Sequence, residues 1–184
     1  FQIGFGGVPG RPIGDGPDGH SLWPSFTNVP NEFVEAYFPL RVETYEFIVD
    51  SGGAGLHRGG NGLSVAYRFL VDGHIGIHDD RWLTYPWGVN GGKPGKRSTK
   101  LLVRADGSEE YIPAKCEGVK VNKGDLLYFN TWGGGGWGDP LQRDPDIVVS
   151  DVSKRLVSIE GAKRYGVVIK EDLALDQTKT DALR

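Results

Sequence analysis

The sequence predicts an α+β fold that is mainly β, with a β-rich body and a short C-terminal helical hairpin. Three observations support this. Apolar and polar residues alternate along much of the span 42–131, and 29 glycines among 184 residues interrupt regular helix. Asp144-Pro145 then forms a typical helix start. We therefore divide the chain into a Gly/Pro-rich extended segment (1–41), a β-rich body (42–143) and a helical hairpin with a tail (144–184).

The first segment is dense in Gly, Pro and Asp over residues 1–31. Proline and glycine disfavour helix, so we expect an extended, turn-rich stretch that packs against other structure. A short helix is expected at 31–37, because Pro30 precedes it and Pro39 stops it.

The body shows the period-2 pattern of strands most clearly in residues 61–71, where Leu63, Val65 and Tyr67 share one face. Two Asp-Gly pairs, Asp72-Gly73 and Asp106-Gly107, predict tight hairpin turns. The strands expected are 42–49, 61–71, 74–79, 99–104, 110–112, 118–121 and 126–131.

The C-terminal part begins with Asp144 as the helix cap and Pro145 at the first helical position. A second short helix is expected to start at Ser158 and to stop at Gly166. We expect a short strand at 167–169 and a polar tail from Asp172 that frays.

Composition excludes several functions. The net charge is −3, and the nearest approach to a basic cluster is Lys93, Lys96, Arg97 and Lys100, interpreted as a solvated loop, so nucleic-acid binding is not expected. No apolar run has the length of a membrane span. Cys116 stands alone, which favours a structural role and a reducing, cytoplasmic location. The chain contains no methionine, which indicates a fragment or a processed product.

Glycine-rich loops are the main candidates for a binding site. Gly134, Gly135 and Gly136 stand between two tryptophans, where backbone N–H groups could hold an anion or a substrate. The alternative is a tight crossover of backbone against another surface. This is not a nucleotide-binding P-loop, because no Gly-Lys-Ser/Thr follows.

Two basic residues stand in similar surroundings. Arg58 precedes Gly59 and Gly60 and could hold a carboxylate or phosphate through two hydrogen bonds, or could belong to a surface turn. Lys93 lies in a second glycine-rich stretch. We take these residues with the three glycines above as candidates for substrate or anion binding.

Metal binding is not predicted for this chain. His74 and His78 would share one face of a strand about 13 Å apart, too far for one zinc ion unless the chain bends at Gly76. No catalytic triad can be identified from the sequence, so the catalytic residues stay unknown.

Four stretches together resemble the hydantoinase B family, in order and with the family's spacing. They are 26–45 (FTNVPNEFVEAYFPLRVETY), 50–62 (DSGGAGLHRGGNG), 87–95 (WGVNGGKPG) and 133–168, which begins GGGGWGDP. Each is weak alone, but together they are specific and cover nearly the whole chain. Trp137 is a departure, since the family commonly has a smaller residue there.

The resemblance implies the C-terminal region of a B-type subunit. Such subunits act with a hydantoinase A-type subunit that binds ATP and Mg²⁺, as in 5-oxoprolinase. They hydrolyse cyclic amides or imides, or carboxylate ketones, by phosphorylating an enol-like oxygen. The family's divalent-metal motifs lie in the N-terminal region and are absent here. The remainder of the B-type subunit and the A-type subunit are thus the expected partners, and this chain alone should be inactive and bind no cofactor.

Three alternatives stay open. The chain could belong to an ATP-dependent ketone carboxylase of the acetone or acetophenone type, or be a non-catalytic β-rich interaction module. Outside the family, Trp82, Trp87 and Trp137 could indicate a carbohydrate-binding β-sandwich. The substrate is not identified, because the family spans hydantoins, oxoproline, lactams and ketones.

Overall fold

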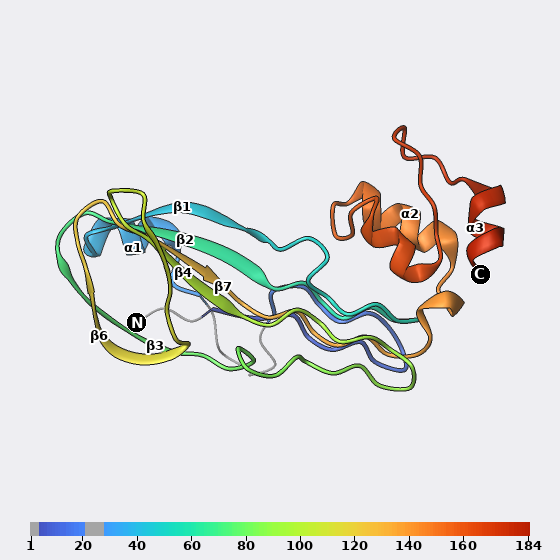
Figure 1. The fold of residues 1–184 in the computed structure, drawn as a ribbon, viewed down its shortest axis with the longest axis horizontal. Helices are drawn as coiled ribbons and strands as arrows, with labels where there is room; N and C mark the ends of the chain where they lie inside the picture. Colours follow the sequence, from blue (N-terminus) through green and yellow to red (C-terminus); the bar gives the residue numbers. More distant parts are fainter. Residues whose placement is uncertain (1–3, 21–27) are drawn as a thin grey trace.

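The computed structural model describes residues 4–20 and 28–184 and shows an elongated molecule in three parts. A β lobe lies at one end, a stem of extended segments runs side by side in the middle, and a helical region with the C-terminus lies at the other end (Figure 1). The parts of the predicted extended segment and first motif that fall on residues 1–3 and 21–27 lie outside this description. The mainly β, α+β prediction is confirmed, while the proposed boundaries at 41 and 143 stay predictions.

The β lobe contains a five-stranded antiparallel sheet of order β1-β2-β7-β4-β5 and a separate antiparallel pair, β3 and β6. Phe69, Leu102, Val121 and Leu127 belong to the apolar core of the lobe. The strands are β1 (Leu40–Phe47), β2 (Leu63–Phe69), β3 (Gly73–His78), β4 (Thr99–Val103), β5 (Glu109–Tyr111), β6 (Lys115–Val121) and β7 (Leu126–Asn130).

One of the two predicted hairpins is wrong. Asp106-Gly107 joins the paired strands β4 and β5, and Gly107 has φ of +86°, which glycine adopts at low cost. At Asp72-Gly73 the chain instead leaves one sheet for the other. The Asp72 carboxylate accepts a hydrogen bond from the Lys123 N–H at 2.8 Å, so this turn is tied to the β6–β7 connection and not to its own neighbours.

The stem consists of segments 4–19, 51–62, 86–96 and 132–138. Their backbones hydrogen-bond to one another, as in Gly134 N–H to Gly60 C=O at 2.8 Å and Lys93 N–H to Ala54 C=O at 2.7 Å. A Cβ on Gly133 would stand 1.9 Å from the Ser51 carbonyl oxygen. Only glycine leaves room for this approach, so the glycine content of the stem follows from contact of backbone with backbone.

The predicted first helix is confirmed as α1 (Asn31–Tyr37), which turns Val34 inward. Asp144 caps α2 (Pro145–Ser153) as expected, by accepting the Asp146 N–H. Gly166, at φ of +66°, ends the 3-10 helix η2 (Gly161–Tyr165), and a second 3-10 turn, η1 (Pro140–Gln142), precedes α2.

The end of the chain differs from the prediction. Residues 167–169 form only an isolated bridge, Ile169 to Leu175, and the expected fraying tail contains the helix α3 (Gln177–Leu183). Thr180 is fully buried on α3, and its hydroxyl accepts the Val168 N–H at 3.0 Å. Tertiary packing thus orders a segment whose polarity suggested disorder. None of the helices in the described ranges is long and apolar enough to cross a membrane.

Candidate functional site

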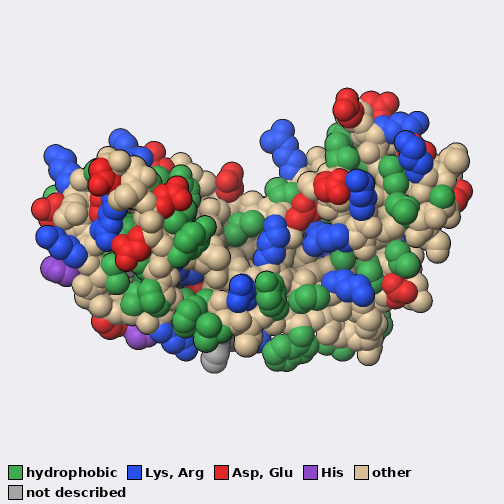
Figure 2. Space-filling view, viewed as in Figure 1, with side chains coloured by type: hydrophobic (Ala, Val, Ile, Leu, Met, Phe, Trp, Pro, Cys, Tyr) green, Lys and Arg blue, Asp and Glu red, His purple; other side chains and the backbone are tan. Residues whose placement is uncertain are grey.

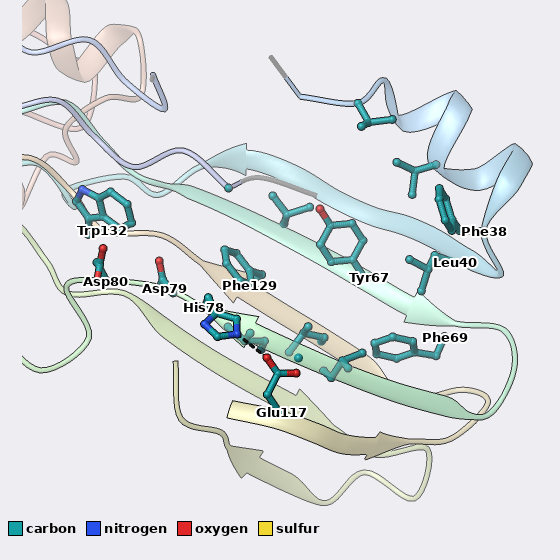
Figure 3. A pocket seen from close by; sticks show the side chains of 18 residues that line it. Phe38, Leu40, Tyr67, Phe69, His78, Asp79, Asp80, Glu117, Phe129 and Trp132 are labelled. Atoms are coloured by element: carbon teal, nitrogen blue, oxygen red, sulfur yellow. Dashed lines mark hydrogen bonds and ion pairs between the residues drawn. The ribbon is translucent and has the colours of Figure 1, made fainter. Parts of the chain in front are cut away.

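A cavity of about 690 Å³ lies in the β lobe, lined by both sheets and by the end of α1 (Figure 3). Its size is in the range of small-molecule sites. Five aromatic or aliphatic side chains illustrate the character of its walls: Val34, Phe38, Leu40, Phe69 and Leu127. These residues alternate along strands or project from α1, so the local pattern of each element turns them toward the cavity.

The cavity becomes polar at the end toward the stem, where the side chains of His78, Asp79, Asp80 and Glu117 gather (Figure 3). His78 Nε2 and Glu117 Oε1 lie 2.5 Å apart across the β3–β6 pair, and both side chains are largely exposed. The register of this pair shifts between Ile75 and Ile77: Ile75 faces Val119 and Ile77 faces Cys116, so the extra residue lies in β6, the strand that carries Glu117. Gly76, where a bend was considered as a condition for metal binding, lies opposite this irregularity.

Behind this polar end lies a buried ion pair. Lys100 Nζ lies 2.5 Å from Asp79 Oδ2, 3.1 Å from the Asn130 carbonyl oxygen and 4.1 Å from the centre of the Phe129 ring. Burial lowers the pKa of Lys100, and the neighbouring Asp79 carboxylate offsets this only in part. The pair links the five-stranded sheet to the end of β3 and fixes one wall of the cavity.

Lys100 corrects one interpretation of the sequence. Lys93, Lys96 and Arg97 are exposed as expected of a solvated loop, but Lys100 is only 1% exposed. It lies at the second position of β4, where alternate side chains turn inward. A carboxylate from another strand compensates its charge, and that partner could not be identified from the sequence.

The chemistry open to the cavity is recognition. Apolar walls suit a hydrocarbon group, whereas the carboxylates at the polar end already pair with Lys100, Lys115 and His78. Among the residues that the structure describes, no group of three or more His, Cys, Asp or Glu side chains is arranged to hold a metal ion.

The predicted anion-binding residues meet in the stem, away from this cavity. A Cβ on Gly59 would stand 2.0 Å from the Gly134 carbonyl oxygen, and the Gly136 N–H donates to the Lys93 carbonyl at 2.9 Å. The N–H groups of Gly59, Gly60 and Gly134 also donate to stem carbonyls. Their backbone donors are thus used inside the stem, which is the close crossover given above as the alternative. The anion-binding role of the set stays a prediction.

Arg58 is buried and lies in a network of charges where the stem meets the helical region. Its guanidinium donates two hydrogen bonds to the Asp18 carboxylate, at 2.7 and 3.0 Å. Arg143 donates to both oxygens of Asp15 at 2.7 Å and to Asp151 at 2.8 Å. The Asp18 carboxylate neutralises the positive charge of Arg58, so this guanidinium is not available to an external anion.

The network holds its charges firmly. Burial works against the charge on Arg143, but the carboxylates of Asp15 and Asp151 outweigh it and raise the pKa of Arg143. Burial also raises the pKa of Asp15, yet hydrogen bonds and charge from Arg143 hold it below its usual range. Sequence reasoning missed this network, because its members lie as many as 128 positions apart.

A second hollow, of about 460 Å³, lies between the stem and η2 and contains Lys96, Lys163 and Arg164 among its lining residues. Arg164 Nη2 lies 2.9 Å from Asp50 Oδ1, and Lys163 Nζ lies 2.7 Å from Glu160 Oε2. These carboxylates balance two of the three positive charges, so the hollow is a weaker candidate than the cavity in the lobe.

Comparison with known proteins shows which family the sequence of this chain matches. Residues 1–140 match the family model described as hydantoinase B/oxoprolinase. The chain is 33% identical over 188 residues to the putative B-type subunit of a D-/L-hydantoinase from Pseudomonas sp. (strain NS671), covering all of this chain and 32% of that protein. It is 35% identical over 160 residues to the beta subunit of caprolactamase from Pseudomonas jessenii, covering 83% of this chain and 27% of that protein.

Two solved structures share the fold. The ATP-dependent caprolactamase from Pseudomonas jessenii matches 96% of this chain and 32% of that chain, with a TM-score of 0.83 and 29% identity. A nucleotide-free acetone carboxylase matches 97% of this chain and 29% of that chain, with a TM-score of 0.80 and 21% identity, which supports the fold alone. The chain therefore spans about a third of the length of these relatives.

Proposed function

The chain belongs to the hydantoinase B/oxoprolinase family, and from that premise we propose that it forms the C-terminal part of a hydantoinase B-type subunit. The enzyme to which it contributes is an ATP-dependent hydrolase of cyclic amides or imides. In this proposal the chain alone is inactive, ATP and Mg²⁺ bind to a hydantoinase A-type subunit, and the divalent metal belongs to the remainder of the B-type subunit.

The observation that carries the proposal is agreement along the whole chain. The relative named as part of a hydantoinase aligns with all 184 residues, and the caprolactamase structure follows 96% of the chain. Many stem glycines pack against specific carbonyls, so the spacing of these glycines is tightly constrained. Shared ancestry explains a match along the whole chain better than independent origin does. A ketone carboxylase is the alternative, because the family resemblance implies either activity, and the acetone carboxylase structure adds similarity of fold alone.

Within this enzyme we assign structural roles to most of the stem and an anion-binding role to Lys93. Arg58 is paired with Asp18, and the amides of Gly59, Gly60 and Gly134 serve stem carbonyls. Lys93 is exposed on the stem, so its ammonium is available to a phosphate or carboxylate.

The test uses the complete enzyme, assembled from this chain, the remainder of the B-type subunit and the A-type subunit. We expect hydantoin, 5-oxoproline or a lactam to be hydrolysed with ATP consumed in proportion, and no bicarbonate requirement. A ketone-dependent and bicarbonate-dependent consumption of ATP would establish the carboxylase alternative. Absence of any ATP-dependent reaction in the assembled complex would contradict both.

The role of Lys93 has its own control. Lys93→Ala should lower kcat/KM of the assembled enzyme by at least about tenfold, the loss of one charge-assisted hydrogen bond to substrate. Lys123→Ala removes a similarly exposed lysine from a turn of the lobe and should leave kcat/KM unchanged. Equal kinetics for the two variants would remove Lys93 from the site.

A further inference from the structure

An exposed apolar stripe runs along the start of the stem segment 86–96 and the residues just before it. Its members are Leu83, Tyr85, Trp87 and Val89, and their exposed fractions are 66%, 54%, 66% and 47%. Tyr85, Trp87 and Val89 occupy alternate positions, with the buried Pro86 between the first two, so these three project to the same side, and Leu83 precedes them in a bend. Figure 2 shows hydrophobic side chains gathered along the lower edge of the molecule with Lys and Arg beside them. Four large apolar side chains in a row is more than scattered surface exposure, and marks an interaction site.

The stripe is held in place from behind. The Val89 N–H donates to the Gly136 carbonyl at 2.9 Å, and a Cβ on Gly135 would stand 1.8 Å from the Trp87 carbonyl oxygen. The backbone therefore packs into the stem while the side chains face outward. Arg81 lies 5.0 Å from the centre of the Trp87 ring, and Arg97 lies 4.6 Å from the centre of the Tyr85 ring. A surface ordered in advance loses little entropy on binding.

The chain segment that carries the stripe has one sign of charge, and the exposed Asp80 lies just before it. No Asp or Glu occurs from residue 81 to residue 105, whereas Arg81, Lys96 and Arg97 fall in this span outside the buried core. A complementary partner therefore presents an apolar centre with carboxylates around it. Tyr, Trp and Arg are also the residues most enriched at the energetic centres of protein interfaces.

The remainder of the subunit is the partner that best fits this surface. The chain spans 32% of the hydantoinase B-type relative that aligns with all of it, so about two thirds of such a subunit lies outside this chain. Interfaces between permanently associated parts of a protein are more apolar than transient ones, as this stripe is. We propose that the stripe is covered by an apolar, carboxylate-rimmed surface of the remainder of the hydantoinase B-type subunit. This inference rests on the function proposed above and locates one of its partners.

The experiment measures binding of this chain to the remainder of the B-type subunit, expressed as a separate polypeptide, by titration calorimetry. Tyr85→Ser with Trp87→Ser should weaken binding by at least about 100-fold, the effect of removing two central aromatic residues. The matched control is Tyr37→Ser with Tyr111→Ser, because those tyrosines are 71% and 73% exposed and lie in the lobe. The control should change the dissociation constant less than about threefold.

A second pair of variants tests the charge. Lys96→Glu with Arg97→Glu should slow association at low salt by about tenfold or more, and the difference should shrink as salt is raised. Circular dichroism on every variant keeps loss of binding separate from loss of folding.

The outcomes are distinct. Stripe variants that bind the remainder as tightly as the unchanged chain would overturn the proposal and leave the family function standing. The proposal is also overturned if those variants lose only the A-type subunit, or only self-association measured by sedimentation. An unchanged chain that binds neither the remainder nor the A-type subunit would contradict the proposed function itself.

Discussion

The β lobe and the stem bury different parts of the polypeptide. In the lobe, side chains such as Leu102 and Val121 fill the space between two sheets. In the stem, backbone lies on backbone, with Gly7, Gly133 and Gly135 each placing a hypothetical Cβ within 2 Å of a carbonyl oxygen. Side-chain cores can repack around a change, but a packed backbone has no flexible atoms to move. The two regions should therefore respond differently to substitutions of the same size.

The largest effect is expected from one methyl group in the stem. Gly133→Ala places its Cβ 1.9 Å from the Ser51 carbonyl oxygen, so two backbone segments must separate and lose their hydrogen bonds. We expect a loss of more than about 4 kcal/mol in the free energy of unfolding, or no folded protein. Urea denaturation measures it, with Gly14→Ala as control, since no atom of the described residues lies within 4 Å of that position's Cβ. Equal stability of the two variants would contradict backbone packing.

The lobe should show the graded response of a side-chain core. Leu102 is fully buried in β4, and Leu102→Ala should cost about 2–5 kcal/mol through lost burial and a residual cavity. Leu102→Met keeps the volume and should cost less than about 1.5 kcal/mol. The comparison with the stem fails if the methionine variant is as unstable as the alanine variant.

The smallest effect is expected at Tyr165, where the helical region packs on Ala54 of the stem. Its hydroxyl is buried and has no hydrogen-bond partner among the described residues. Tyr165→Phe should therefore change the melting temperature little at pH 7, or raise it, because an unsatisfied polar group is removed. A fall of several degrees would show that the hydroxyl has a partner.

The same tyrosine predicts a dependence on alkaline pH. Burial raises the pKa of Tyr165 to about 12, above the value of about 10 in an unfolded chain. Below pH 10 the phenol is neutral in the folded and the unfolded chain, so its ionisation does not affect stability. As the pH rises from 10 to 12, ionisation of the unfolded chain lowers the free energy of unfolding. Stability of the unchanged chain should fall over this window by about 1.4 kcal/mol per pH unit more than that of Tyr165→Phe.

Sequence reasoning recovered what depends on neighbours in the chain. Pro30 and Pro39 located α1, Asp144 located α2, and alternation located the strands. It failed where distant residues decide. The turn at Asp72 is determined by Lys123, and α3 is ordered by burial of Thr180.

In the candidate site, too, local sequence patterns indicated single residues but not the distant residues that complete the site. His78 was considered as a metal ligand together with His74, but the cavity beside His78 needs residues of α1 and both sheets, which no local pattern brings together. Lys100 has an apolar neighbour on one side and a threonine on the other, and nothing local marks it as buried. Glycine density indicated close approach of backbone, yet the facing carbonyls lie in segments far along the chain.

The stem also limits how this sequence can change over evolutionary time. Most stem glycines face one particular carbonyl on a neighbouring segment, so an insertion or deletion of one residue would move every later glycine of that segment out of place at once. Length changes in descendants of this sequence should therefore collect in the hairpin at 104–108 and the turn at 170–174, while the stem segments keep a constant number of residues.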